Sequence, residues 1–316
     1  MQQKLTFSWK KKGRIYDPGI EHGFIKSHAQ MPTALYLNDE KKIRIYFSTR
    51  SIGNISQATF IDVDIKDPSK ILYVHDKPVI EIGKDGMFDE HGIMPTVVLK
   101  KDNTIYLYYT GWSLRVNIPY SNWGGLAISK DNGITFKKIS LAPILDRTAY
   151  DLFSAGASTI IIENNVWRML YVSGIDWVKV NGKYEQTYSV KYASSLDGIT
   201  WNREKHIIIP QTHPLEAITR PTVAKIFGKY HMWFCYRGCN DFRDGLESYK
   251  IGYAWSNDYL NWHREDEKAG ILPSSEGWDS RMLAYPKVIE VMGKYLMFYN
   301  GNGFGKSGFG YAELEF

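Results

Sequence analysis

The sequence contains very little cysteine and no long apolar run. Cys235 and Cys239 are the only cysteines in 316 residues, and one C-x-x-x-C pair without a second pair is weak evidence for zinc. We therefore expect reduced, structural thiols. No apolar stretch is long enough to cross a bilayer, and residues 1–14 lack the apolar core of a secretory signal. These absences predict a cytoplasmic protein with no membrane span.

Positive charge is not concentrated in one stripe. The formal net charge is +5, and apart from residues 10–12 the lysines and arginines are spread along the chain. Nucleic-acid-binding proteins usually carry a basic patch or stripe, so we expect no nucleic-acid partner. A small anionic substrate is compatible with this charge. The sequence also shows no clear cluster of metal-ligating residue types, and we predict no cofactor.

Aromatic residues, in contrast, are abundant, with 10 Trp, 22 Tyr and 14 Phe. Aromatic side chains favour strands, and their faces also suit sugar rings. The chain is 44% hydrophobic, which is ample for a large packed core. We expect most of the aromatic side chains to lie in the core of a β-structure.

A five-residue segment recurs at nearly constant spacing. Its second residue falls at positions 32, 95, 158, 221 and 286, so successive copies are 63, 63, 63 and 65 residues apart. The copies are residues 31–35, 94–98, 157–161, 220–224 and 285–289. Self-similarity at a fixed period indicates a repeat architecture.

Each copy is followed by a short polar turn and a strand rich in aromatic residues. These second strands are predicted over residues 43–50, 105–111, 167–174, 230–238 and 295–301. Third strands that end in S-x-D-like turns are predicted over residues 126–136, 190–201 and 251–262. Alternating side chains and Asn-Gly or Asp-Gly turns indicate antiparallel hairpins, and a fourth, more polar strand closes each unit. Helical periodicity is almost absent.

Four antiparallel strands repeated five times predict an all-β fold, a five-bladed β-propeller. The fifth unit ends after its third strand, residues 308–316, whereas residues 7–17 resemble the fourth strands of the other units. We therefore expect the N-terminal strand to complete the last blade and close the ring, which removes an exposed sheet edge. The sequence predicts a single domain over residues 1–316.

The strand order predicts where a site lies. The N-terminal ends of the first strands and the loops between second and third strands share one face, because the first two strands of a blade are antiparallel. The residues predicted to bind substrate there are His28, Gln30, His91, Trp112, Arg220, Arg237, Asp279 and Arg281. Arginine suits bidentate binding of carboxylate or phosphate groups.

Acidic residues that precede the first strands are the catalytic candidates. They are Glu90, Glu216, Asp151 and Asp89. Glycoside hydrolysis needs two carboxyl groups on either side of the scissile bond. Glu90 and Glu216 are predicted to be the acid/base pair, with Asp151 or Asp89 in support.

The repeat qualifies this prediction. Asp89, Asp151 and Asp279 each follow an aromatic residue, and a feature present in three blades favours a role in the scaffold. Glu90 and Glu216, together with His91, Arg220 and Arg281, break the repeat, which favours function. An ion pair between Glu216 and Arg220 along the channel is the alternative for those two residues.

The motifs resemble those of a known superfamily. The S-x-D-x-G-x-x-aromatic turns look like the structural Asp-boxes of sialidases, so Asp131 and Asp197 are expected to form turns. The whole blade pattern, with Pro-x-Val at the axis and a Tyr-rich second strand, resembles the five-bladed propeller glycosidases. That superfamily includes the arabinanase and xylosidase, invertase and mannoside-phosphorylase types.

The resemblance implies a base or nucleophile on the first blade, a supporting carboxylate on the second and an acid on the third, close to the proline of the first strand. This sequence departs from that pattern. The two residues before that position are Gln30-Met31, Ile93-Met94, Gly156-Ala157, Thr219-Arg220 and Ala284-Tyr285. None is acidic, so the triad of the superfamily cannot be transferred directly.

Three functions stay open. The first, which we favour from the sequence, is a glycoside hydrolase-like enzyme that acts on a small or anionic carbohydrate in the central funnel. The second is a phosphorylase of the same fold, in which Arg220, Arg281 and a histidine bind phosphate and one carboxylic acid suffices. The third is a non-catalytic glycan-binding protein linked to polysaccharide metabolism, which the missing acidic residues favour. A sialidase, with six blades and three clustered arginines, fits less well.

Overall fold

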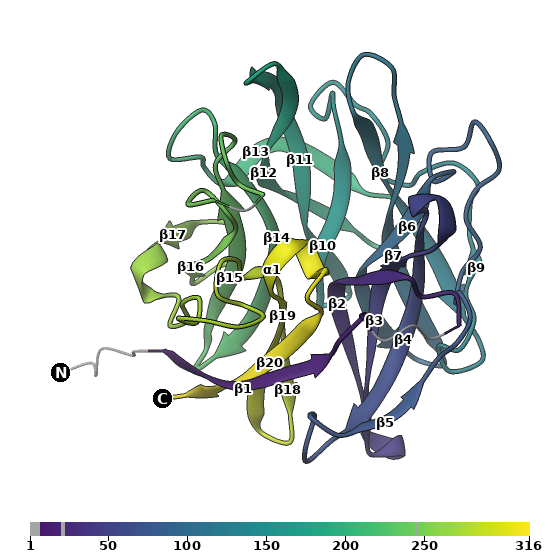
Figure 1. The fold of residues 1–316 in the computed structure, drawn as a ribbon, viewed down its shortest axis with the longest axis vertical. Helices are drawn as coiled ribbons and strands as arrows, with labels where there is room; N and C mark the ends of the chain where they lie inside the picture. The colour runs from purple at the N-terminus through teal and green to yellow at the C-terminus, as the bar shows by residue number, and fades with distance from the viewer. Residues whose placement is uncertain (1–6, 20–22, 244) are drawn as a thin grey trace.

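The computed structural model describes residues 7–19, 23–243 and 245–316, which are almost entirely β-structure (Figure 1). Within them the only α-helix is the four-residue α1 (Asn302–Gly305), accompanied by the 3-10 turns η1 (Asn38–Glu40), η2 (Ile52–Asn54) and η3 (Asp266–Lys268). The prediction of an all-β fold with almost no helix is confirmed. Figure 1 shows the sheets standing around a common middle, the arrangement of a β-propeller.

The described strands form three sheets, and each is built from antiparallel sets of four strands. One eight-stranded sheet holds β2 (Ser27–Leu37), β3 (Lys42–Arg50), β4 (Ser56–Asp64), β5 (Ile71–Val74), β6 (Gly92–Lys101), β7 (Thr104–Leu114), β8 (Tyr120–Ser129) and β9 (Lys137–Lys138). The other holds β10 (Ala155–Glu163), β11 (Val166–Val180), β12 (Lys183–Ser195), β13 (Asn202–Ile209), β14 (Ala217–Ile226), β15 (Lys229–Arg237), β16 (Lys250–Ser256) and β17 (Trp262–Arg264). The four-stranded sheet has the order β1 (Ser8–Tyr16), β20 (Phe309–Glu315), β19 (Lys294–Asn300) and β18 (Ala284–Val291).

Each eight-stranded sheet consists of two consecutive sets joined by one parallel bridge. The bridges pair Ser56 with Gly92 and Tyr188 with Ala217. The recurring segments lie in β2, β6, β10, β14 and β18, which are the first strands of the sets. The aromatic segments that follow form β3, β7, β11, β15 and β19, as predicted.

The N-terminal strand pairs with the C-terminal strand. β1 runs antiparallel to β20 with a register from Ser8 opposite Glu315 to Tyr16 opposite Phe309. The two strands lie side by side in the lower part of Figure 1. β1 therefore supplies the fourth strand of the last set, and the predicted pairing is confirmed.

Aromatic side chains fill the core between neighbouring sets. The largest fully buried residues include Trp167, Trp233, Tyr108, Tyr171 and Tyr299, all from second strands. Burial of each such side chain contributes roughly 1.5–3 kcal/mol by removing apolar surface from water. The expectation that most aromatic residues belong to the core of the β-structure is confirmed.

The Asp-box-like turns are held by side-chain oxygens. An Asp131 carboxylate oxygen accepts the backbone N–H of Thr135 (3.0 Å), and Asp197 Oδ1 accepts those of Ile199 (2.7 Å) and Thr200 (2.8 Å). These backbone hydrogen bonds lower the pKa of Asp197, because they favour its charged form. Both aspartates are turn formers, as predicted.

Both cysteines are buried free thiols. Residues 1–6, part of the segment predicted to lack a secretory signal, lie outside the described residues. Where the structure does describe the chain, it contains no helix with the length and apolar character required to cross a bilayer.

Candidate active site

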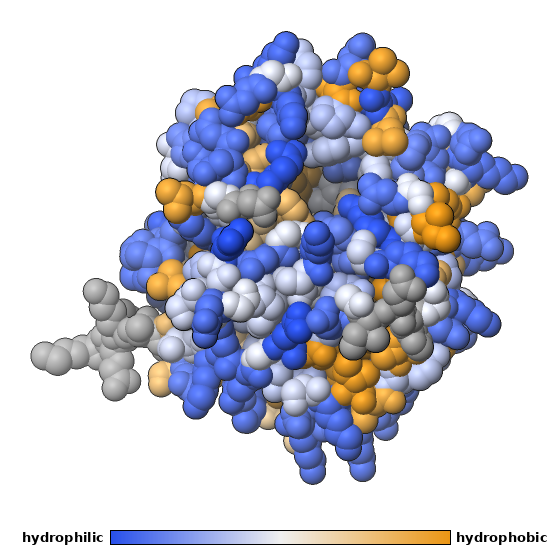
Figure 2. Space-filling model, in the orientation of Figure 1, coloured by the Kyte–Doolittle hydropathy of each residue, from blue (hydrophilic) through white to orange (hydrophobic). Residues whose placement is uncertain are grey.

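A cavity of about 410 Å³ lies where the first strands begin. All five of these strands line it, through Gln30 (β2), Thr96 (β6), Ser158 (β10), Arg220 (β14) and Tyr285 (β18). Its volume falls within the roughly 300–1,000 Å³ of small-molecule sites. Figure 2 shows a hollow near the middle of the displayed face, among mostly hydrophilic side chains.

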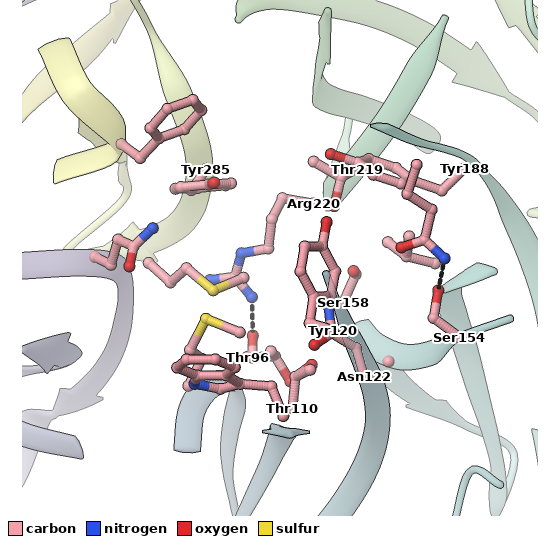
Figure 3. Close-up of a pocket in the computed structure, with 18 of the residues that line it drawn as sticks. Thr96, Thr110, Tyr120, Asn122, Ser154, Ser158, Tyr188, Thr219, Arg220 and Tyr285 are labelled. Atoms are coloured by element: carbon pink, nitrogen blue, oxygen red, sulfur yellow. Dashed lines mark hydrogen bonds between the residues drawn. The ribbon is translucent and has the colours of Figure 1, made fainter. Parts of the chain in front are cut away.

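Second strands, third strands and loops complete the walls. They add Arg50, Trp112, Tyr120, Glu185, Tyr188, Arg237, Arg243 and Tyr249, among others. Figure 3 shows Tyr120, Tyr188 and Tyr285 placed around Arg220. The cavity therefore combines aromatic faces, which suit sugar rings, with several cationic groups.

The charges that line the cavity are mostly positive. Its described lining residues include four arginines but a single carboxylate, that of Glu185. Arg243 pairs with Glu185 through two hydrogen bonds, Nη1 to Oε1 (2.6 Å) and Nη2 to Oε2 (3.1 Å). Arg50, Arg220 and Arg237 have no carboxylate partner among the described residues, and we refer to these three as the cavity arginines.

Arg220 reaches across the cavity because of a local bend in β14. A β-bulge interrupts the pairing of β14 with β15 between Thr219 and Thr222, and Arg220 adopts a left-handed backbone conformation with φ of 53°. Bulges commonly re-aim a side chain, and a non-glycine residue in this region costs on the order of 1 kcal/mol. This backbone conformation directs the guanidinium toward Thr33 on β2 and Thr96 on β6.

The Arg220 guanidinium is buried without a neutralising anion. Nη2 donates to Thr33 Oγ1 (3.0 Å) and Nη1 donates to the carbonyl oxygen of Thr96, as the dashed line in Figure 3 shows. The buried Nε–H has no partner among the described residues. Burial lowers the pKa of Arg220 to about 10, because removal from water disfavours the charged form.

Arg50 is anchored by neutral groups. Its Nη2 donates to Gln30 Oε1 (3.1 Å) and its Nη1 donates to Ser56 Oγ. The guanidinium carbon lies 5.5 Å from the centroid of the Trp112 ring. A guanidinium has five N–H donors, so these contacts leave donors available for a ligand.

Arg237 is likewise held by neutral groups. It donates to the backbone carbonyls of Gly238 (2.6 Å) and Gln186 (3.1 Å), and its guanidinium carbon lies 3.7 Å from the Phe242 ring centroid. Its Nε–H is buried and has no partner where the structure is described. The site thus holds concentrated positive charge without matching negative charge, which is suited to an anion.

The predicted catalytic aspartates do not line this cavity. Asp151 is fully buried and accepts hydrogen bonds from Lys191 (3.2 Å), Arg203 (3.0 Å) and Ser173 (2.7 Å). Asp89 is also fully buried and binds Lys138 (2.5 Å). The partners of both carboxylates belong to the propeller scaffold.

Glu216 and Asp279 are placed in the same manner. Glu216 accepts hydrogen bonds from Arg264 (2.7 and 3.0 Å) and from the backbone N–H of Thr212 (2.7 Å). Burial raises the pKa of Glu216, but the hydrogen bonds outweigh burial and leave the pKa below its ordinary value. Asp279 binds Lys11 (2.7 Å). The partner of Glu216 is thus Arg264 rather than Arg220, which corrects the alternative that paired those two residues.

These four residues, the scaffold carboxylates Asp89, Asp151, Glu216 and Asp279, share one arrangement. Each carboxylate pairs with a cation from the outermost strand of its own set: Lys138 on β9, Arg203 on β13, Arg264 on β17 and Lys11 on β1. Three also accept a hydrogen bond from a second-strand tyrosine: Tyr109, Tyr171 and Tyr299. The repeated aromatic-Asp motif is therefore an ionic link within each of the three sets of strands that carry it.

The other predicted residues outside the cavity lie in varied surroundings. Glu90 Oε2 accepts the backbone N–H of Gly86 (2.5 Å) in a surface turn. The His91 ring lies 5.8 Å from Trp112. His28 is partly buried, and this burial together with nearby Arg50 lowers its pKa to about 4. Arg281 is exposed to solvent.

Of the residues predicted to bind substrate, Gln30, Trp112, Arg220 and Arg237 line the cavity. Sequence reasoning missed Arg50, Glu185, Tyr188 and Tyr249. Arg50 carried a usable signal, because it ends its second strand as Arg237 does. Glu185 and Tyr188 lie on β12, where the long β11–β12 hairpin hides their register in the sequence.

No site for a metal ion is evident in the described part of the chain, because no group of three or more His, Cys, Asp or Glu side chains is placed to hold one.

Comparison with known sequences finds one kind of relative over nearly the whole chain and another over less than half of it. It is 35% identical to the uncharacterized protein Rv1502 of Mycobacterium tuberculosis over 309 residues, 98% of this chain and 99% of that protein. It is 28% identical to a β-1,2-mannobiose phosphorylase of Thermoanaerobacter sp. over 151 residues, 45% of each chain. No protein-family model matches.

The fold is shared with solved glycosidases. An endo-arabinase of Bacteroides thetaiotaomicron superimposes with a TM-score of 0.66 and 13% identity, covering 96% of this chain and 98% of the other. At this identity the likeness concerns the fold alone. The predicted resemblance to the propeller glycosidase and phosphorylase superfamily is confirmed.

Proposed function

Because the chain belongs to the family of the Mycobacterium tuberculosis protein Rv1502 and has a glycosidase-like propeller fold, we propose that it is a phosphorylase-type enzyme. It transfers a glycosyl group from a small carbohydrate to inorganic phosphate in the cavity around Arg220. The observation that carries this proposal is the imbalance of charge there: three cavity arginines without carboxylate partners and a single carboxylate among the described lining residues.

This imbalance favours phosphorolysis over hydrolysis. A glycoside hydrolase ordinarily requires two carboxyl groups, one to protonate the leaving group and one to act as base or nucleophile. Phosphate is its own nucleophile, so a second carboxyl group is not needed. Arginine donors bind phosphate oxygens through short, charge-assisted hydrogen bonds. A phosphate dianion at the cavity arginines also offsets the cost of burying their charges.

The partial match to a β-1,2-mannobiose phosphorylase suggests the first substrate to try. We propose a β-linked mannoside, with a sugar ring against Trp112 and phosphate beside Arg50 and Arg220. A phosphate oxygen forms a bond to the anomeric carbon while the glycosidic C–O bond breaks, and the leaving oxygen takes a proton. The products are a sugar 1-phosphate and the shortened sugar.

The proposal includes a closed ring of five blades in one domain, residues 1–316, with the cavity at its axis. The pairing of β1 with β20 and the Lys11–Asp279 ion pair support it, since they give the last set the four-stranded form of the others. Contacts between the last set and β2 support closure. Asn300 Oδ1 accepts the N–H of Met31 (2.8 Å) and its Nδ2 donates to the carbonyl of Ala29 (2.7 Å).

The test is phosphate dependence. The purified full chain is incubated with β-1,2-mannobiose with and without inorganic phosphate, and sugar 1-phosphate and free mannose are quantified. We expect sugar 1-phosphate only when phosphate is present. Mannose release at the same rate without phosphate would identify a hydrolase and contradict the proposal.

Two variants sharpen this assay. Arg50→Gln removes a cavity arginine, and we expect the KM for phosphate to rise about 10- to 100-fold, the loss of one or two hydrogen bonds to a charged group. Arg281→Gln is the matched control, because Arg281 is exposed and does not line the cavity. Equal effects of the two substitutions would contradict the assignment of phosphate to the cavity.

A second candidate function is glycan binding without turnover. It is favoured by the ion pair between Glu185 and Arg243, which engages both oxygens of the cavity carboxylate. Saturable binding of mannosides with no product, with or without phosphate, would select this function over the phosphorylase.

A further inference from the structure

Among its described lining residues, the cavity has no carboxylic acid that is free to donate a proton. Glu185, the one carboxylate among its described lining residues, accepts two hydrogen bonds from Arg243. The Arg243 guanidinium therefore occupies both oxygens of this carboxylate. A sugar leaves poorly as an alkoxide, so the leaving oxygen needs a proton from a positioned acid. That acid must come from another group in the cavity.

Four tyrosines line the cavity, and one pair of them differs from the rest. The hydroxyls of Tyr188 and Tyr249 are hydrogen-bonded to each other. The hydroxyls of Tyr120 and Tyr285, in contrast, have no hydrogen-bond partner among the described residues. Tyr249 is almost fully buried, whereas Tyr188 is only partly buried. Tyr188 is therefore the more accessible member of the pair, and its hydroxyl is backed by a second O–H group.

A cation lies beside this pair. The guanidinium carbon of Arg237 is 5.3 Å from the centroid of the Tyr188 ring and 5.7 Å from that of Tyr249. A nearby positive charge favours the phenolate form of a tyrosine. A hydrogen bond donated by Tyr249 stabilises the same form. Burial raises the pKa of Tyr249, so its hydroxyl keeps its proton and remains a donor.

We infer that Tyr188 is the general acid of the reaction, with Tyr249 and Arg237 as positioning residues that stabilise its phenolate. This inference rests on the proposed phosphorylase function. As the glycosidic C–O bond breaks, the Tyr188 hydroxyl gives its proton to the leaving oxygen. An oxygen of hydrogen phosphate forms the new bond to the anomeric carbon. The product sugar phosphate then returns its remaining phosphate proton to the phenolate, so Tyr188 ends the cycle protonated.

The experiment compares leaving groups that differ in their need for a proton. The full chain and its Tyr188→Phe variant are assayed with phosphate on β-1,2-mannobiose and on 4-nitrophenyl β-mannoside. The sugar leaving group needs a proton, whereas nitrophenolate leaves without one. We expect kcat/KM of Tyr188→Phe to fall about 100-fold or more on the disaccharide, the usual contribution of a general acid. On the nitrophenyl substrate we expect a change of less than about threefold.

Tyr285→Phe is the matched control. Tyr285 lines the same cavity, and its hydroxyl has no hydrogen-bond partner among the described residues. Removal of this hydroxyl is expected to change kcat/KM by the same small factor on both substrates. Thermal unfolding of both variants checks that the fold is kept. An equal loss on both substrates by Tyr188→Phe would overturn the role of Tyr188 and leave the phosphorylase standing. Absence of phosphate-dependent product from the wild-type chain on either substrate would overturn both.

Discussion

Buried charge is handled in opposite ways in two regions of this protein. At the starts of the first strands, the scaffold carboxylates Asp89, Asp151, Glu216 and Asp279 each meet a lysine or arginine from the outermost strand of their own set. In the cavity, Arg50, Arg220 and Arg237 meet only neutral groups among the described residues. The difference separates charges that complete the fold from charges that await a ligand.

The physical basis is the cost of taking an ion out of water. That cost is several kcal/mol per ion, and a well-placed counter-ion with further hydrogen bonds repays much of it. The scaffold carboxylates have such counter-ions within the protein. The cavity arginines have no such counter-ion among the described residues, so a bound anion would supply the missing negative charge. Uncompensated charge in a cavity is for this reason a better indicator of function than charge alone.

The largest effect is expected from removing a scaffold charge. Asp151→Asn leaves Lys191 and Arg203 buried without their carboxylate, and we expect the free energy of unfolding to fall by about 3–5 kcal/mol. Urea unfolding followed by fluorescence measures it. Asp85→Asn is the control, since Asp85 is exposed and should change the free energy by less than about 0.5 kcal/mol. If the Asp151→Asn variant is instead stable but has lost turnover, Asp151 acts in catalysis rather than in the scaffold.

The ion pair at the seam of the first and last strands sharpens the comparison. Asp279→Asn leaves Lys11 without its partner, and we expect a loss of about 2–3 kcal/mol, since Lys11 is partly solvated. In a double-mutant cycle, adding Lys11→Met should restore part of that loss, because no unpaired charge remains. Strictly additive losses in urea unfolding would show that the two residues act independently and would weaken the parallel with the other sets.

The fold followed from the sequence more fully than the site did, for a geometric reason. The spacing of the repeat predicts which residues occupy equivalent positions in each set of strands, so it predicts the first and second strands correctly. It does not fix the direction of a side chain. Glu216 and Arg220 both break the repeat four residues apart, yet Glu216 turns into its blade toward Arg264 while a bulge aims Arg220 into the cavity. Arg264 is 48 residues from Glu216 in sequence, so no local pattern reveals the pair.

Substitution of Arg220 tests the cavity in the same way that substitution of Asp151 tests the scaffold. Inorganic phosphate at about ten times its Kd should stabilise the wild-type chain by about 1.4 kcal/mol. Arg220→Gln should lose most of this stabilisation. Without phosphate, its free energy of unfolding should lie within about 1 kcal/mol of wild type, because the cost of the buried charge disappears with its hydrogen bonds. Thermal unfolding across a phosphate series measures both quantities.

The pH dependence of this protection gives an independent check. The pKa of Arg220 is lowered to about 10 in the cavity, so its charge disappears as pH rises through that value. Phosphate protection that involves Arg220 should therefore weaken above about pH 10. If phosphate stabilises Arg220→Gln as much as it stabilises the wild-type chain, phosphate binds elsewhere. The distinction between paired scaffold carboxylates and ligand-binding cavity arginines would then fail.

A buried histidine illustrates a third solution, which is to avoid charge. His231 is 4% exposed, lies 2.7 Å from the Tyr253 hydroxyl through Nδ1, and has its pKa lowered to about 4 by burial. The unfolded chain binds a proton near pH 6.5 whereas the native protein does not, so stability is present above that pH and is lost as pH falls toward 4. We expect a loss on the order of 3 kcal/mol across this range, since each unit of pKa shift corresponds to about 1.4 kcal/mol. In His231→Gln, which keeps a hydrogen-bonding group beside Tyr253, this part of the pH dependence should vanish, whereas substitution of the exposed His206 by Gln should preserve it. An unchanged profile in His231→Gln, measured by urea unfolding from pH 7 to 4, would show that the protein does not hold this histidine neutral.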